Sequence, residues 1–191
     1  MSVREIATVG HPVLRERARE VSEEELRSPE LQTLIDDMTD TMRNASGAGL
    51  AANQVHDLHR VAVVEVREGN PRYPYKPPVP LTVIVNPEIE PLDDETFAVN
   101  EGCLSVPGLR GELPRHVSIR VRCLDREGRE HTEVRRGLTA GTFQHEVDHL
   151  DGILFVDRAD PRTLASWEQF ERNQRQEFEA RARELVERVG S

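Results

Sequence analysis

Lysine is nearly missing from this 191-residue chain, in which Lys76 is the only lysine among 25 basic residues. The bias towards arginine points to a GC-rich genome rather than to a function. Acidic residues number 35, and the formal net charge of −10 argues against a general nucleic-acid-binding surface. Two cysteines are too few for a disulfide scaffold and fit a reducing cytoplasm. Long apolar runs are also missing, so we expect no signal peptide and no membrane span.

A His-Glu-x-x-His arrangement near the C-terminal third is the strongest pattern present. Residues four apart lie on one face of a helix, so His145 and His149 can point their imidazoles at one metal ion. Glu146 can then take a proton from water bound to that metal. The apolar spacing from Leu138 onward predicts a helix that Gly152 ends. Taken alone, the pattern is equally compatible with two ordinary surface or core histidines.

Two imidazoles and one water leave a tetrahedral ion one ligand short, and cysteine can supply the missing donor. Cys123 is in phase with the alternating apolar positions of residues 117–124, which predicts a core strand residue. Cys103 is flanked by Gly102 and followed closely by Pro107, which predicts a loop rather than an ordinary core strand. A thiolate from such a loop is a strong metal ligand, and we expect Cys103 to fill that role.

A third segment, residues 47–55, is rich in glycine and alanine and contains the amide side chain of Gln54. On its own it is equally typical of a glycine-rich turn packed against a neighbour. It lacks the lysine and hydroxyl residue of a phosphate-binding loop, which argues against nucleotide binding.

Together the three segments resemble the signature of the peptide deformylase family, where they occur in this order. They stand here as Gly47-Ala48-Gly49-Leu50-Ala51-Ala52-Asn53-Gln54, Glu101-Gly102-Cys103-Leu104-Ser105 and Gln144-His145-Glu146-Val147-Asp148-His149-Leu150. The resemblance extends through residues 11–15 and 152–158 and covers most of residues 1–160. It implies an α+β fold with small antiparallel or mixed sheets packed around a central metal-binding helix. Length favours a single catalytic domain over residues 1–191.

The resemblance implies a metal-dependent hydrolase that removes the N-formyl group from the initiator methionine of nascent polypeptides and releases formate. The metal ligands carried over are Cys103, His145 and His149. Fe²⁺ is the expected ion, and Zn²⁺, Ni²⁺ or Co²⁺ can substitute for it. Metal-bound water is the expected nucleophile and Glu146 the general base and acid. The Gln54 amide, the Leu104 backbone N–H and the metal are expected to hold the oxyanion.

A substrate pocket near the metal is also implied by the resemblance. Its expected residues are Ala48, Gly49, Val99, Gly102, Arg110, Leu138, Gly141 and Thr142. Ala48 and Gly141 are smaller than the residues usual at these positions, which leaves the strictness for methionine open. Arg110 is either a contact for the later residues of the peptide or a merely solvated side chain.

Supporting residues around the metal can be expected from the same resemblance. Arg115 matches an arginine that braces the ligand helix through an ion pair with Asp148. A simply solvated Asp148 is the alternative. Glu101, beside the cysteine, is a further candidate for such support.

The remaining pattern is mixed α and β. Ser28 and Pro29 predict a helix start, and residues 61–66 and 81–85 predict strands. Residues 67–80 are rich in proline and predict an inserted loop, which is either an inert linker or a partner contact.

The C-terminal segment predicts one long helix over residues 161–189, because Asp160 and Pro161 match a cap and a first-turn proline. Balanced glutamate and arginine on it favour a solvated face. In some deformylases a C-terminal helix contacts the ribosome, and the resemblance implies the same contact here, although the mixed charge of this helix differs from a basic stripe. A truncation after Asp160 that left ribosome co-sedimentation unchanged would count against it.

Two rival classes remain open. A His-Glu-x-x-His metallopeptidase would take its third ligand from downstream, for instance Glu168. Replacing Cys103 with alanine separates the two, because only the deformylase would lose its metal. A non-catalytic family member that binds formylated chains or metal is the second rival, and no catalytic residue is missing to support it.

Overall fold

The computed structural model describes residues 2–191. Its larger sheet has five strands in the order β1–β2–β3–β6–β7, all paired antiparallel. Their bounds are Gly49–Ala51 (β1), Val61–Val66 (β2), Val79–Pro91 (β3), Ser118–Leu124 (β6) and Glu130–Arg136 (β7). The strand predicted over residues 61–66 is confirmed. The strand predicted over residues 81–85 is longer, because β3 already pairs with β2 from Val79.

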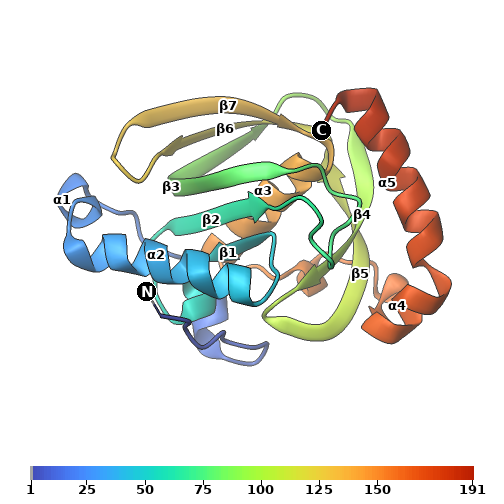
Figure 1. Cartoon of the computed structure of the whole chain (residues 1–191), viewed down its shortest axis with the longest axis horizontal. Coiled ribbons are helices and arrows are strands. Elements are labelled where there is room, and N and C mark those ends of the chain that lie inside the picture. The colour runs from blue at the N-terminus through green and yellow to red at the C-terminus, as the bar shows by residue number, and fades with distance from the viewer. Residues whose placement is uncertain (1) are drawn as a thin grey trace.

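A smaller sheet of three strands packs at the other side of the molecule (Figure 1). Its strands are β4 (Thr96–Cys103), β5 (Val106–His116) and β8 (Ala165–Ser166), in that order. The loop predicted around Cys103 is therefore wrong, because this residue ends β4. Cys103 still pairs with Val106, and the register of the ladder shifts between Gly102 and Cys103.

Helix α3 (Gly137–Leu150) is the central element and lies between the two sheets. Ala140, Phe143, Val147 and Leu150 pack against the larger sheet in one apolar cluster. The opposite face of the helix contacts β4 and β5. The predicted stop is confirmed, since Gly152 has a positive φ of 75° just after the helix.

Helix α2 (Pro29–Asn44) covers the other face of the larger sheet, and the short α1 (Glu23–Leu26) precedes it (Figure 1). Ser28 caps α2 by accepting a hydrogen bond from the Leu31 N–H, as its sequence predicted. Single 3₁₀ turns complete the N-terminal and middle regions. They are η1 (Pro12–Arg15), η2 (Ala52–Val55), η3 (Phe155–Asp157) and η4 (Pro161–Thr163).

The single helix predicted over residues 161–189 is wrong in its extent. Asp160 and Pro161 start only the short turn η4, and the chain then pairs with β5 as β8. Ser166 caps a new helix, α4 (Trp167–Asn173), through the Gln169 N–H. The backbone at Gln174 leaves the helical region before α5 (Arg175–Val189) begins. The break lets Phe170 and Phe178 meet at the base of the two helices.

Within residues 2–191, the helices are too short or too polar to cross a bilayer.

Candidate metal centre and active site

Cys103, His145 and His149 converge between the smaller sheet and helix α3. Their donor atoms all lie within 4.8 Å of one another. The Cys103 Sγ is 3.1 Å from the Nε2 of His149, and the two imidazole rings are 4.9 Å apart between centroids. The spacing of four residues on α3 places both rings on one face, and the end of β4 supplies the thiol. The three predicted ligands are therefore brought together.

This donor set fits a divalent transition metal. Burial would raise the pKa of the Cys103 thiol, but the neighbouring His149 and His145 outweigh burial and hold that pKa well below its usual range. A thiolate with two imidazoles suits iron and zinc alike. Within the described residues, the Oε2 of Glu146 is buried without a hydrogen-bond partner. An unpartnered carboxylate oxygen beside three convergent donors is expected where an ion and its water are held.

A buried network of charges supports the ligand helix from β4 and β5. Arg115 donates from Nε and Nη2 to the Glu101 carboxylate at 2.7 and 3.0 Å, and from Nη1 to Asp148 at 2.5 Å. The ion pair predicted between Arg115 and Asp148 is thus present. Glu101 also lies 2.7 Å from the Nδ1 of His145, which leaves the Nε2 of that ring for the metal.

The charges of this network explain the state of Glu101. Burial would raise the pKa of its carboxyl, but the charges of Arg115 and His145 and their hydrogen bonds outweigh it and hold the pKa well below its usual range. Burial likewise works against the charge on His145, yet Glu101 and the Cys103 thiolate raise its pKa well above the ordinary value. Glu101 therefore acts as an ionised acceptor that orients the imidazole.

Glu146 lies in the same cavity, and its carboxylate lies against Gly49. It is 3% exposed, and burial raises its pKa against the opposing influence of the two histidines. A Cβ placed on Gly49 would overlap the Glu146 carboxylate, so only glycine leaves room for this side chain. The turn interpretation of residues 47–55 missed this. The segment contributes strand β1 and the turn η2, and its glycine at position 49 accommodates the carboxylate.

Gln54 is held in one orientation beside the thiol. Its Oε1 accepts a hydrogen bond from the Ala51 N–H at 2.9 Å, and its Nε2 donates to the Ser105 Oγ at 3.0 Å. The same Nε2 lies 3.5 Å from the Cys103 Sγ. The amide N–H groups therefore face the metal ligands, and Leu104 lines the cavity next to them.

Asn53 and Gln144 anchor helix α3 through their side-chain amides. Both lie within the signature segments, but no role was predicted for them. Asn53 donates from Nδ2 to the backbone carbonyl of His149. Gln144 exchanges two hydrogen bonds with the backbone of His116, at 3.0 and 2.9 Å. Their presence inside two of the three signature segments was the signal available. They tie the ligand helix to η2 and to the end of β5.

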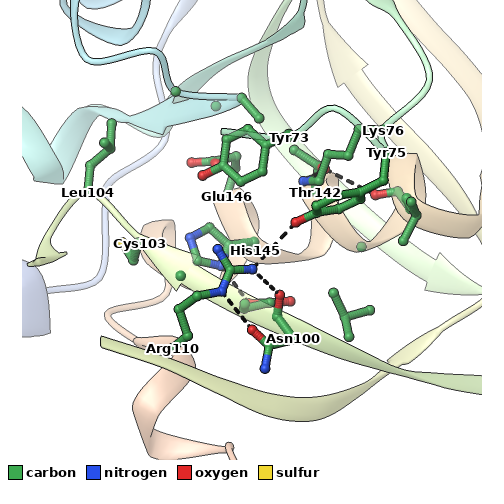
Figure 2. A pocket seen from close by; sticks show the side chains of 18 of the residues that line it. Tyr73, Tyr75, Lys76, Asn100, Cys103, Leu104, Arg110, Thr142, His145 and Glu146 are labelled. Atoms are coloured by element: carbon green, nitrogen blue, oxygen red, sulfur yellow. Dashed lines mark hydrogen bonds and ion pairs between the residues drawn. The ribbon is translucent and has the colours of Figure 1, made fainter. Parts of the chain in front are cut away.

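All eight predicted substrate residues line one cavity that also contains Cys103, His145 and Glu146 (Figure 2). These residues are Ala48, Gly49, Val99, Gly102, Arg110, Leu138, Gly141 and Thr142. Five further lining residues were not predicted: Gly47, Tyr73, Tyr75, Lys76 and Asn100. The two tyrosines and Lys76 come from the proline-rich segment, which connects β2 to β3, so the inert-linker interpretation is wrong. Its tyrosines and its lone lysine were the only signal for this.

Arg110 is buried, and its guanidinium is held by neighbouring side chains. It is 1% exposed, and its guanidinium lies 4.3 Å from the Phe170 ring centroid and 4.9 Å from that of Trp167. Its Nε and Nη2 donate to the side chain and backbone of Asn100 at 2.7 and 2.6 Å. Trp167 and Phe170 of helix α4 thus pack against Arg110, which itself lines the cavity.

Tyr75, in the proline-rich segment, connects the cavity lining to helix α5. Its ring meets the Phe178 ring edge-on at 5.1 Å between centroids, and its hydroxyl lies 3.4 Å from the Nη2 of Arg110. Helix α5 is therefore in contact with the residues that line the cavity, through Phe178. Its outer face carries pairs of arginine and glutamate four residues apart, as expected.

Glu168 lies outside the metal centre. It is on α4 and pairs with Arg172, and its side chain is 73% exposed. The metallopeptidase alternative that takes Glu168 as third ligand is therefore wrong for this structure.

Comparison with known proteins agrees with this site. A family model described as polypeptide deformylase matches residues 3–165. A peptide deformylase of Leptospira biflexa is 46% identical over 158 residues, which is 83% of this chain and 88% of the relative. The crystal structure of a class I type b peptide deformylase from Acinetobacter baumannii with Met-Ala-Ser bound is 43% identical. It has a TM-score of 0.79 and covers 83% of this chain and 99% of its own. A deformylase from Synechococcus elongatus in complex with actinonin, 31% identical with a TM-score of 0.72, covers 98% of this chain and 86% of its own.

Proposed function

Because this chain belongs to the polypeptide deformylase family, we propose that Glu146 carries the proton while the enzyme removes the formyl group of an initiator methionine. The reaction is a metal-dependent hydrolysis of a linear amide on nascent polypeptides, and it releases formate. One observation carries the proposal: the Glu146 carboxylate shares a cavity with the Cys103, His145 and His149 donors. Its unpartnered Oε2 is available to a water molecule there.

Each residue of the site has a separate role in the proposed reaction. A divalent ion held by the three ligands would lower the pKa of a water molecule towards neutrality and polarise the formyl oxygen. Glu146 accepts the proton of the water that attacks the formyl carbon, and burial, which raises its pKa above the ordinary carboxyl value, favours this uptake. The negative oxygen that develops is met by the Gln54 Nε2 and the Leu104 backbone N–H. Glu146 then returns the proton to the amine as the C–N bond breaks.

Iron is the metal that we propose for the native enzyme. The thiolate and the two imidazoles accept Fe²⁺, and the same set accepts Zn²⁺, Ni²⁺ or Co²⁺. A metal-bound thiolate is open to oxidation, so Cys103 is the sensitive point of an iron form. Glu101, Arg115 and Asp148 hold the ligand helix in place behind it.

The cavity suits a methionine side chain among Val99, Leu138, Gly141 and Thr142. The backbone at residues 48–49 and 102 is positioned to pair with the main chain of the peptide as an added strand, which tolerates many sequences. The Met-Ala-Ser bound to the Acinetobacter relative supports this placement, because that chain is 43% identical over nearly its full length. Arg110 closes the cavity on the side of the later peptide residues.

We place the reaction in the cytoplasm, where new polypeptides emerge. Contact between α5 and the ribosome stays a prediction. The inner face of α5 is already used, since Phe178, Ala182 and Leu185 are buried in the apolar cluster that includes Val99 of β4 and Leu138 of α3. A ribosome contact would therefore have to use its outer, mixed-charge face.

Formate release from formyl-Met-Ala-Ser tests the proposal. Protein purified without oxygen should carry iron by elemental analysis and release formate. A chelator should abolish release, and Fe²⁺ or Ni²⁺ should restore it. Metal-loaded protein that releases no formate would contradict deformylation, and zinc as the only bound metal would contradict the assignment of iron.

Replacing Gly49 with alanine should lower kcat by about ten- to a hundredfold, because the new Cβ displaces the Glu146 carboxylate by a fraction of an ångström or more. The matched control is Gly47→Ala. Its Cβ would meet the side chains of Leu104 and Met42 at 3.1 and 3.2 Å and the Met42 carbonyl oxygen at 3.3 Å, but not Glu146, and we expect less than a threefold change in kcat. Steady-state kinetics on both variants decides the matter, and equal kcat values would contradict the account.

A further inference from the structure

The chain's one lysine enters the wall of the catalytic cavity. Lys76 belongs to the proline-rich segment, and its Nζ donates to the Thr142 Oγ1 at 2.8 Å (Figure 2). Thr142 lies one turn before His145 on α3, on the face that meets the metal centre. The Lys76 ammonium also lies 4.8 Å from the centroid of the Tyr73 ring. A cation is therefore built into a pocket whose neighbouring residues, Val99 and Leu138, are apolar.

The Lys76 ammonium has more N–H groups than its hydrogen bond to Thr142 uses. An ammonium carries three N–H groups. In the part of the chain that the structure describes, its hydrogen bond is to Thr142 and its other contact is the Tyr73 ring. A partly buried cation without a carboxylate against it is costly unless a ligand or water satisfies it. Lys76 and Gly141 line the same cavity, and glycine adds no side chain to it.

We propose that Lys76 determines specificity for the first side chain of the formylated peptide by donating a hydrogen bond to an acceptor near its end. The inference rests on the proposed function and names the substrate class. The thioether of methionine is a weak acceptor, whereas the oxygen of methionine sulfoxide is a strong one. The methylene of norleucine accepts nothing and leaves the remaining N–H groups of the ammonium desolvated without an acceptor. The enzyme therefore favours formylated methionine sulfoxide over methionine, and methionine over norleucine.

The electrostatic environment agrees with this role. Burial lowers the pKa of Lys76 to about 8, and the charges of Glu101 and Glu146 only partly offset it. The ammonium is thus poorly hydrated, and a poorly hydrated donor discriminates more strongly between a ligand that accepts a hydrogen bond and one that does not.

The test compares kcat/KM for three peptides, formyl-X-Ala-Ser, in which X is methionine, methionine sulfoxide or norleucine. In Lys76→Met, an unbranched apolar replacement, the ratio of sulfoxide to norleucine should fall by about ten- to a hundredfold, the range for a hydrogen bond to a charged donor. Arg67→Met is the matched control. It removes a positive charge from the same segment, but its side chain is 62% exposed and outside the cavity. Its ratio should match wild type.

The ratio of kcat/KM values distinguishes a failure of the role of Lys76 from a failure of deformylation itself. Formate release from formyl-Met-Ala-Ser with an unchanged ratio in Lys76→Met would overturn the role of Lys76 and leave deformylation standing. No release from any peptide by wild-type protein would overturn deformylation itself.

A second measurement on wild-type protein remains decisive if the variant fails to fold. Lysine labelled with ¹³C at Cε gives a single side-chain signal, because the chain has one lysine. Met(O)-Ala-Ser, the sulfoxide product, should shift that signal more than Nle-Ala-Ser does at equal occupancy. Equal shifts would overturn the proposal.

Discussion

Replacing Glu146 with glutamine is expected to lower kcat for formate release by about 10²- to 10⁴-fold, with metal content unchanged. Glutamine keeps the size of the side chain beside Gly49 but cannot accept the proton of the attacking water. Cys103, His145 and His149 are untouched, so the ion should remain bound. Steady-state kinetics on formyl-Met-Ala-Ser, with elemental analysis of the same sample, measures both quantities.

Glu177→Gln is the matched control, because it neutralises an exposed carboxylate on α5 outside the cavity. It should behave as wild type. A Glu146→Gln variant that keeps its metal and more than a tenth of the wild-type kcat would assign the proton transfer to another group. A variant that loses its metal would mean that Glu146 contributes to holding the ion.

The metal centre could be predicted because its information is local. A spacing of four residues fixes which side chains share a helix face, and α3 carries both histidines as expected. Ser28 and Gly152 mark helix ends by the hydrogen bonding and backbone preferences of single residues, and both predictions are confirmed. The third ligand came from elimination and resemblance, since there are only two cysteines.

The remainder of the pocket depends on contacts between distant segments. Nothing within residues 67–80 shows that Tyr75 will meet Phe178 or that Lys76 will reach Thr142, because these partners are far apart in sequence. The break at Gln174 has no proline or glycine to mark it and arises where Phe170 and Phe178 pack together. The strand that ends at Cys103 was not predicted, because its glycine and the nearby proline usually indicate a loop.

Arg115 carries the largest expected effect on stability. Arg115→Met should lower the free energy of unfolding by about 3–5 kcal/mol, because it leaves buried carboxylates without their main partner. Glu101 is affected most, since both its oxygens accept from this guanidinium, whereas Asp148 keeps Arg158 at 2.9 Å. Metal affinity should also fall by about ten- to a hundredfold, because Glu101 orients the His145 ring. Urea unfolding and a metal-competition titration measure the two effects.

Arg120→Met is the control for removing an arginine from a strand. Arg120 pairs with Glu90 at 2.6 Å, but both side chains are about half exposed, so the expected loss is at most about 1 kcal/mol. The double variant Arg115→Met/Glu101→Gln separates a stranded charge from lost packing. If the unpaired Glu101 carboxylate causes the loss, neutralising it should restore more than half of the unfolding free energy that Arg115→Met loses. This holds even though the His145 ring is then hydrogen-bonded to a neutral amide instead of a carboxylate. A double variant no more stable than Arg115→Met would show that the arginine acts by filling space between β5 and α3 rather than by its charge.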